Sequence, residues 1–258
     1  MSGASPGNSR APSPEEHPGQ SSRLTPKTLL VLGSKPEPVL PPRHAYDALA
    51  CANASGFSAD RHGLPMPAFT AMSAVLTSGV ASGRHSLQAV SGLGTGRLYF
   101  VPRPPHKLTL AKRLLHPVRT YRITARCLRN TLRSVGYRYE EFVELRWHQY
   151  YSVFEALCRD KPEILELLGQ KHPSTGVAAV VLGLTRERYE RVIISGFSFE
   201  LTHAHGHNPD IDERLTVASK HAATDIAVLQ HLHETRGNVY TTEPAVTERA
   251  GIPPLPGI

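Results

Sequence analysis

The chain has 258 residues, of which 40% are hydrophobic, and it carries a formal net charge of +7 at neutral pH. That length and apolar content favour one α/β domain with a flexible extension over two independent domains. Three scattered cysteines argue against a disulfide framework and for a reducing compartment, so we expect a cytoplasmic protein. No run of about 18 apolar residues occurs, so we expect neither a membrane-spanning helix nor a secretory signal.

Residues 1–26 are dominated by Ser, Pro, Gly and Glu, with too few aliphatic side chains to offset the entropy of ordering. We therefore expect a disordered tail, followed by a single domain over residues 27–245. The domain begins at residues 28–32, where a short apolar run predicts a buried parallel strand. The next loop, Gly33-Ser34-Lys35-Pro36, is either a phosphate-binding loop, because glycine permits close backbone approach, or an ordinary turn.

Three further strands are predicted at residues 48–52, 69–75 and 97–101. Small polar residues follow such strands where the carboxyl ends of a parallel sheet meet a ligand. Asn53 is the best candidate among them, because its amide can both donate to and accept from a nucleotide or a phosphate. An asparagine that caps a turn is the equally weighted alternative.

Residues 103–135 contain nine lysines and arginines and no acidic residue, so the positive charge is localised. Five arginines fall within an arc of about 80° on one predicted helix: Arg119, Arg122, Arg126, Arg129 and Arg133. The adjacent face carries Tyr121, Ala125, Leu128 and Leu132. This cationic amphipathic pattern is typical of helices that rest on anionic membranes, and a solvated charged face is the alternative. No nucleic-acid-reading motif is present, so a nucleic acid partner is disfavoured.

Residues 103–170 are predicted to be helical, with the basic segment at the start and a break near Pro162. Trp147, Tyr150 and Tyr151 lie on this stretch. Aromatic residues at such spacing are typical of a core, and an acceptor-binding platform is the alternative.

The region after residue 171 has a more specific order. Ser174, Thr175 and Gly176 precede an apolar helix, so hydroxyls and free backbone N–H groups gather at a helix N-terminus that can bind an anion. A buried strand at residues 191–196 follows, and the polar residues 197–218 are predicted to form a lid. A helix at 219–234, a strand at 238–241 and a C-terminal tail at 246–258 complete the chain.

Five motifs occur in the order found in bacterial sialyltransferases of glycosyltransferase family 42, which the chain resembles over residues 28–243. They are Gly33-Ser34-Lys35-Pro36, Cys51-Ala52-Asn53, Ser174-Thr175-Gly176-Val177, Ile193-Ile194-Ser195-Gly196-Phe197, and His221 with Asp225-Ile226. The resemblance implies an α/β fold with a Rossmann-like, modified glycosyltransferase-A sheet that is mostly parallel. It also implies transfer of sialic acid from a cytidine monophosphate (CMP) donor, with no metal or other cofactor.

The resemblance also assigns roles to residues. Donor contacts are implied for Gly33, Ser34, Asn53, Ser73, Ser174, Thr175, Gly176 and Gly196. His221 would be the general base, and a neutral imidazole suits the removal of a hydroxyl proton. Its place in a first helical turn would lower its pKa, while Asp225 would raise the pKa and fix the ring tautomer.

Several departures from the family pattern concern this site. Related enzymes carry asparagine where Ser34 stands and another asparagine near Ser73, and their histidine precedes the aspartate by five residues instead of four. They stabilise the leaving phosphate with tyrosine hydroxyls, whereas Glu200 occupies the first such position and would repel a phosphate. We therefore expect the missing donors to come from the lid, where the candidates are His203, His205, His207 and Arg214.

The lid also offers two metal-binding patterns. The three alternate histidines could bind zinc, and the pair Asp210 and Asp212 resembles the metal-binding carboxylates of many nucleotide-sugar transferases. Histidines in polar loops are more often solvated, and the aspartates lie far from a strand end, so we expect no metal.

The sequence thus predicts an inverting glycosyltransferase that transfers sialic acid from a CMP-sugar to a hydroxyl of a glycan or glycolipid. The arginine stripe would hold it on the inner face of the membrane as a peripheral protein. The alternatives are a transferase that uses another nucleotide sugar and a non-catalytic membrane- or anion-binding protein that retains the fold. The oligomeric state leaves no local signature.

Overall fold

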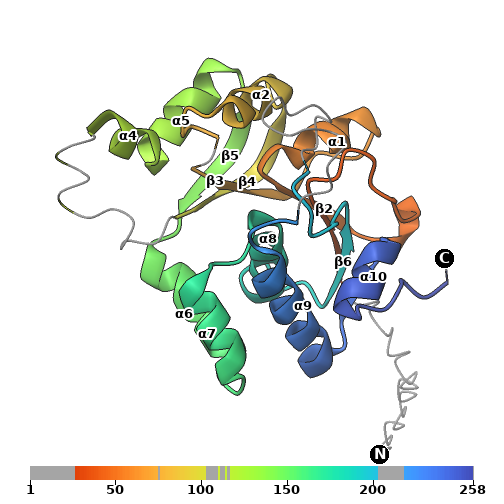
Figure 1. Ribbon diagram of the computed structural model, residues 1–258. Helices are drawn as coiled ribbons and strands as arrows, with labels where there is room; N and C mark the ends of the chain where they lie inside the picture. Colours follow the sequence, from red (N-terminus) through yellow and green to blue (C-terminus); the bar gives the residue numbers. More distant parts are fainter. Residues whose placement is uncertain are drawn as a thin grey trace, which may run out of the picture.

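The computed structural model describes residues 27–74, 76–102, 110, 114, 117–202 and 218–257. Its described strands form one seven-stranded sheet in the order β5-β4-β3-β2-β1-β6-β7, and every pairing is parallel (Figure 1). The strands are β1 (Thr28–Leu32), β2 (Ala48–Ala52), β3 (Phe69–Ser73), β4 (Gly94–Val101), β5 (Arg138–Glu144), β6 (Arg191–Ser195) and β7 (Val239–Thr241). The α/β architecture and the parallel sheet expected from the sequence are confirmed.

Helices cover both faces of this sheet (Figure 1). They are α1 (Gly56–Arg61), α2 (Ala81–Ala89), α4 (Pro117–Arg122), α5 (Ala125–Ser134), α6 (Trp147–Leu157), α7 (Pro162–Gln170), α8 (Thr175–Thr185), α9 (Ala222–Arg236) and α10 (Pro244–Ala250). Two short 3-10 helices, η1 (Arg43–Ala45) and η2 (Asn53–Ser55), follow the first two strands. No described helix is both long enough and apolar enough to cross a membrane.

The strands supply core side chains to both faces because successive residues point to opposite sides. Leu29 and Val31 pack with α6 to α10, whereas Leu30 and Leu32 pack on the other face. β1 is buried over its whole length and pairs with β2 on one side and β6 on the other. This position explains the continuous apolar run from which the sequence predicted a buried strand.

The predicted helix over residues 139–145 is wrong, because residues 138–144 form the edge strand β5. Leu98 and Phe142 face each other across the β4–β5 pair. β4 would otherwise present unpaired backbone groups at the edge of the sheet, and the Tyr, Phe and Val side chains of this segment favour strands. The break near Pro162 is confirmed, since this proline begins α7.

The prediction that the five arginines lie on one helix is also wrong, because they are divided between α4 and α5. Helix α4 ends at Arg122 and α5 begins at Ala125. The Thr124 side chain caps α5 by accepting a hydrogen bond from Cys127 N at 3.2 Å. Leu128 and Leu132 of α5 are fully buried in the core. Three of the four residues of the apolar face that was expected to rest on a membrane are therefore buried in the protein, and Tyr121 alone stays exposed.

The predicted C-terminal tail at residues 246–258 is wrong over most of its length. Residues 244–250 form α10, Ile252 is completely buried, and Pro254 bridges Thr241 of β7. The sequence gives little sign of this packing, because the segment is short and rich in proline. It becomes ordered because β7 and α9 offer an apolar surface.

Candidate functional site at the carboxyl edge of the sheet

Most of the predicted site residues lie at one edge of the sheet. Strands β3, β2, β1 and β6 are neighbours and end together, and α8 and α9 each run back from this edge before the next parallel strand begins. The edge therefore receives residues from strand ends and from helix starts. They are Gly33, Ser34, Asn53, Ser73, Ser174, Thr175, Gly196 and His221.

Asn53 and Ser73 are brought into contact at the ends of β2 and β3. The Ser73 backbone N and hydroxyl both donate to Asn53 Oδ1, at 2.9 and 3.2 Å. Asn53 has a φ of 52°, in the left-handed region that asparagine tolerates better than most residues. The Asn53 carbonyl oxygen is therefore used within the protein, and its Nδ2 donor has no hydrogen bond to another described residue.

Gly33 and Gly196 mark a close crossing of the chain beyond β1 and β6. A Cβ atom on Gly33 would lie 2.3 Å from the Gly196 carbonyl oxygen, so no larger residue is accommodated without a backbone shift. Lys35 N donates to the same carbonyl at 2.9 Å. Backbone packing thus accounts for Gly33, and the neighbouring Ser34 hydroxyl lies 3.2 Å from that of Thr202.

Ser174 caps α8, because its hydroxyl accepts a hydrogen bond from Val177 N at 3.3 Å. The Ser174 backbone N is also engaged, since it donates to Asp225 Oδ1 at 2.7 Å. Gly176 is buried, and a Cβ there would lie 2.9 Å from the Phe197 ring. The anion site predicted at this helix start therefore retains fewer free donors than the sequence suggested, while Thr175 is half-buried at the first position of α8.

The expected pairing of Asp225 with His221 is wrong. His221 is the N-cap of α9, and its Nδ1 lies 2.8 Å from the His172 carbonyl oxygen. A carbonyl only accepts, so this contact requires the proton on Nδ1 and leaves a lone pair on Nε2. The backbone at His172 thus fixes the tautomer, the role that the sequence had assigned to Asp225.

Burial separates the charge states of these two side chains. The pKa of His221 falls to about 4, chiefly because burial disfavours the imidazolium, although the bond to His172 partly opposes this shift. The pKa of Asp225 rises to about 7, because the carboxyl is also buried and the hydrogen bonds from Ser174 offset only part of the effect. His221 is therefore neutral at physiological pH, as expected, but through burial more than through the helix dipole.

An aromatic row extends from His221 along α6. The ring centroids of His172 and His221 lie 5.1 Å apart, and Trp147 contacts His172 edge-on at 6.5 Å. Trp147 also stacks on Tyr151 at 5.4 Å. Tyr150 belongs to the core, as expected, whereas Trp147 and Tyr151 are only partly buried against it.

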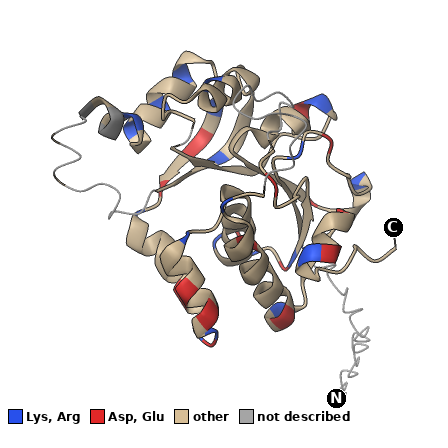
Figure 2. Cartoon of the chain, in the orientation of Figure 1, with Lys and Arg blue, Asp and Glu red and all other residues tan. Residues whose placement is uncertain are grey.

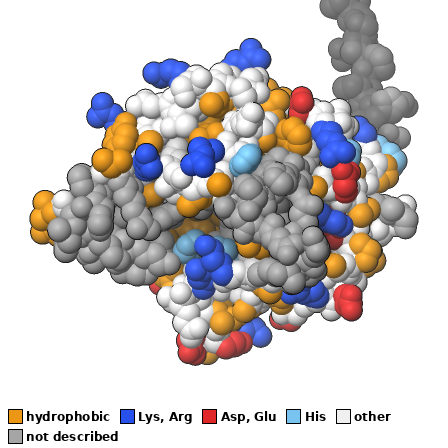
Figure 3. Space-filling view, turned by 45° about the horizontal axis from the view of Figure 1, so that its top comes forward, with side chains coloured by type: hydrophobic (Ala, Val, Ile, Leu, Met, Phe, Trp, Pro, Cys, Tyr) orange, Lys and Arg blue, Asp and Glu red, His pale blue; other side chains and the backbone are white. Residues whose placement is uncertain are grey.

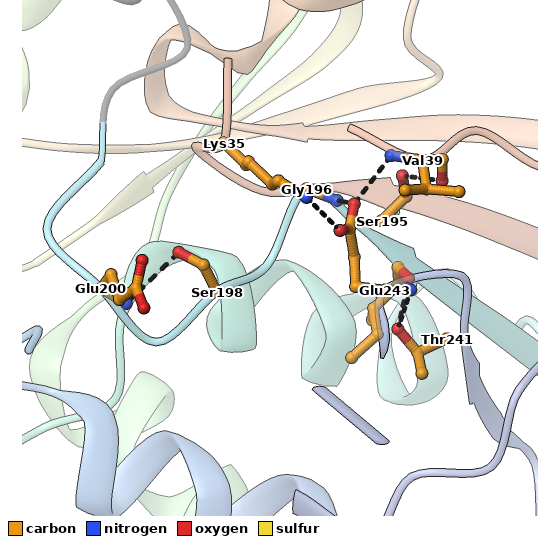
Figure 4. Close-up of polar contacts among 9 residues, drawn as sticks. Lys35, Val39, Ser195, Gly196, Ser198, Glu200, Thr241 and Glu243 are labelled. Atoms are coloured by element: carbon orange, nitrogen blue, oxygen red, sulfur yellow. Dashed lines mark hydrogen bonds and ion pairs between the residues drawn. The ribbon is translucent and has the colours of Figure 1, made fainter. Parts of the chain in front are cut away.

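A buried carboxylate that the sequence reading missed joins three strand ends. Glu243 is 1% exposed, and its Oε1 accepts from Val39 N and Gly196 N, each at 2.8 Å (Figure 4). Its Oε2 accepts from Lys35 Nζ at 2.6 Å. The signal was available, because Glu243 follows the predicted last strand and parallel strand ends converge. It ties the exits of β1 and β6 to the start of α10.

Glu200, the residue expected to repel a phosphate, lies near a cation. Arg249 of α10 lies 3.9 Å from Glu200 Oε1, donates to the Ser198 carbonyl at 2.9 Å and stacks over Phe199. Both charged side chains are more than one third exposed, so their attraction is weak. Arg249 nevertheless reduces the negative potential that Glu200 alone would create.

A cavity of about 550 Å³ lies on the β7 side of Glu243. Its walls are mainly apolar and include Val39, Leu40, Pro244 and Leu255. None of the predicted donor-binding or catalytic residues lines it. Glu243 therefore stands between this cavity and the strand ends that carry the predicted site.

Several predicted residues lie outside the described part of the chain. They are His203, His205, His207, Asp210, Asp212 and Arg214 of the lid and the Arg119 side chain of α4. Within the described part of the chain, no group of three or more His, Cys, Asp or Glu side chains is placed to hold a metal ion.

Solved structures match this arrangement of strands and helices. The α-2,3/8-sialyltransferase CstII, as a point mutant, matches with a TM-score of 0.52 and 12% identity, covering 89% of this chain and 87% of that chain. CstII from Campylobacter jejuni in complex with CMP-3FNeuAc gives 0.50 and 13%, covering 90% and 87%. CstII with CMP gives 0.50 and 14%, covering 88% and 86%. The chain has the fold of these sialyltransferases.

The predicted resemblance is thus confirmed for the fold, as a distant likeness. No protein-family model matches the sequence, and no curated protein does so either. At 12% to 14% identity, the match shows a shared arrangement of sheet and helices. The chemistry has to be argued from the residues of the site.

Proposed function

We propose that this chain is an inverting, metal-independent glycosyltransferase that transfers sialic acid from a CMP-sugar to a glycan hydroxyl. The observation that carries the proposal is the state of His221. Its Nδ1 is held by the His172 carbonyl, and its pKa of about 4 keeps Nε2 unprotonated near neutral pH. A neutral imidazole fixed in this tautomer is suited to general-base catalysis.

In the proposed reaction, His221 Nε2 removes the proton of the acceptor hydroxyl. The acceptor oxygen attacks the anomeric carbon, and the bond from that carbon to the phosphate oxygen breaks. The electron pair leaves with CMP, so one displacement inverts the anomeric centre. A bound anionic donor would raise the pKa of His221 toward the operating pH, which strengthens the base when substrate is present.

The donor would lie along the strand ends. Asn53 Nδ2 and the Ser34 and Thr175 hydroxyls offer polar contacts there, and solved sialyltransferases with this fold are complexes with CMP or a CMP-sugar analogue. Lys35 Nζ uses one donor on Glu243 and is one third exposed, so it adds a cation that could face a phosphate. The sequence reading had named the loop but not this side chain.

The leaving phosphate would be met by His203, His205, His207 or Arg214. Replacement of the three histidines together by alanine should lower turnover much more than acceptor affinity, because stabilisation of the leaving group acts mainly in the transition state. Steady-state kinetics with varied acceptor separates the two effects. Unchanged turnover would remove the lid histidines from the mechanism.

The decisive experiment is product formation from CMP-sialic acid in the presence of EDTA, compared between the wild type and His221→Ala. We expect the substitution to lower turnover by about 10²- to 10⁴-fold with CMP affinity retained in calorimetry. His148→Ala, at an exposed position of α6, is the matched control and should leave turnover unchanged.

Each alternative has its own signature in this experiment. Wild-type turnover in His221→Ala would refute the general base, and failure of the wild type to bind any cytidine nucleotide would refute the donor. Binding of CMP without turnover of any nucleotide sugar would favour the non-catalytic anion-binding protein. Turnover with a different nucleotide sugar would keep the mechanism and change the substrate.

A further inference from the structure

Exposed apolar side chains gather around α4. Eight large hydrophobic side chains are exposed among the described residues, and three of them lie on α4 or beside Gly79, which Arg122 of α4 contacts: Val80, Val118 and Tyr121. Val118 and Tyr121 lie on α4, with exposed fractions of 64% and 46%. Val80 follows Gly79, against which the Arg122 side chain packs. Clustered apolar exposure of this kind usually marks a docking surface.

Arginines lie on the elements that carry these apolar residues and on the adjoining helix α5. Arg84 Nη1 donates to the Gly79 carbonyl at 3.2 Å, and Arg122 contacts the same glycine. Arg126, Arg129 and Arg133 project from the exposed face of α5. None of these five side chains forms an ion pair with a described carboxylate, and helices α4 and α5 carry no acidic residue (Figure 2). Figure 3 shows basic and hydrophobic side chains interspersed on this face.

The apolar residues that are exposed on α4 and α5 differ from those that the sequence pattern predicts. Of the predicted apolar face, Ala125, Leu128 and Leu132 are buried and cannot reach a bilayer. Tyr121 of that face stays exposed, and Val118 lies three residues before it on the same short helix, so both can face outward on one side. The basic and apolar components needed at a lipid surface are therefore both exposed, on adjacent helices.

We propose that α4, the loop at Gly79–Val80 and the exposed face of α5 form a docking surface for an anionic lipid bilayer. Guanidinium groups pair with lipid phosphates, and a tyrosine places an apolar ring and a polar tip at the headgroup level. A second copy of the chain is a poorer occupant, because a symmetric contact would set one arginine cluster against another. A nucleic acid would use the arginines but leave Val80 and Val118 without a partner.

This surface adjoins the candidate site. The loop at Gly79–Val80 follows the carboxyl end of β3, and α2 contacts η2, which begins with Asn53. Docking would bring the carboxyl edge of the sheet near the lipid, where an acceptor linked to the membrane would be found. The docking itself does not depend on the proposed transferase activity.

The test is flotation of the full chain with vesicles of phosphatidylcholine, with or without phosphatidylglycerol. We expect binding only to the anionic vesicles, weakened by salt. Arg126→Gln with Arg133→Gln should lower the partition coefficient by roughly 10- to 30-fold, since each basic residue contributes about 1 kcal/mol at such a surface. Arg159→Gln with Arg236→Gln removes the same charge at exposed sites elsewhere and should have little effect.

The apolar contribution is tested separately. Val118→Ser with Tyr121→Ser should lower binding at least tenfold at low and at high salt alike, whereas Met66→Ser, at another exposed position, should not. All replaced side chains are exposed, so thermal melting should be unchanged and confirms that the variants fold.

Four results would overturn the proposal. These are equal binding to neutral and anionic vesicles, no vesicle binding by the wild type, wild-type binding by both surface variants, and a dimer that Val118→Ser with Tyr121→Ser converts to monomer. A nucleic acid oligonucleotide that binds where vesicles do not would also assign the surface to that other partner.

Discussion

Two polar side chains at the carboxyl edge of the sheet, the buried Glu243 and the half-buried His221, differ in how many of their polar atoms are hydrogen-bonded. Glu243 accepts three hydrogen bonds through its two oxygens and holds the exits of β1 and β6. His221 is held at one ring nitrogen and keeps the other without a hydrogen bond to a described residue. A side chain whose polar atoms all form hydrogen bonds within the protein stabilises the fold. A side chain that is held in place through one atom and has another atom free can take part in a reaction.

The strongest challenge to this contrast is the replacement of His221 by glutamine. We expect kcat/KM to fall by about 10²- to 10⁴-fold, because glutamine cannot take a proton. In the wild type, kcat/KM should fall as the pH drops through about 4, where the imidazole becomes protonated. A pH profile of both proteins checks this. An acid limb near 6.5, the usual value for histidine, would contradict the effect of burial on His221.

The structural role of Glu243 is tested by its effect on stability. Glu243→Ala leaves Gly196 N and Val39 N without their acceptor and Lys35 without its partner, so we expect a loss of roughly 3–5 kcal/mol in unfolding free energy. Glu243→Gln retains an acceptor and should lose less. Urea unfolding measures both, with Glu248→Ala, exposed on the same helix, as the control. Equal stability of Glu243→Ala and the control would show that the junction does not hold the strands.

Asp225 gives a smaller and pH-dependent effect. Its pKa of about 7 exceeds the ordinary value of 3.8, so the folded protein holds a proton that the unfolded chain loses above about pH 4. The stability from this group is full below about pH 4, declines as the pH rises to about 7 and is constant above that. Asp225→Asn can still accept from Ser174 N and cannot ionise. It should gain roughly 2–4 kcal/mol over the wild type by pH 8.

The control for this gain is Asp60→Asn, which makes the same change of side chain at an exposed position of α1. Unfolding by urea between pH 4 and 8 provides the measurement. Transfer activity should survive in Asp225→Asn, because His221 depends on the His172 carbonyl for its tautomer. Loss of transfer with an unchanged fold would return Asp225 to the catalytic role that the sequence assigned.

The smallest effect is expected at Arg249. Arg249→Gln removes the cation near Glu200, so CMP binding should weaken by about three- to fivefold, while binding of cytidine, which lacks the phosphate, should not change. Adding Glu200→Gln should restore CMP affinity, because the repelling carboxylate is then absent. Calorimetry with both ligands gives the comparison. An equal loss for CMP and cytidine would assign Arg249 to the shape of the segment at Ser198 alone.

The strands were predictable where burial leaves a local mark. β1, β2, β3 and β6 are short apolar runs that end in small residues, and the structure places them as expected. β5 was missed because it is an edge strand with exposed glutamates, and its hydrogen-bonding partner, β4, lies about 40 residues earlier in the chain.

The sequence by itself determined the central parallel sheet, the likeness to sialyltransferases, and the candidates Asn53, Ser174 and His221. These depend on residue types at fixed short spacings. The tertiary structure decided that Asp225 serves Ser174, that the His172 carbonyl orients His221, and that Glu243 joins strands more than 200 residues apart. Hydrogen bonds between segments that are distant in the sequence produce no recognisable spacing of residues. The pKa shifts follow from burial, which arises only when the chain packs.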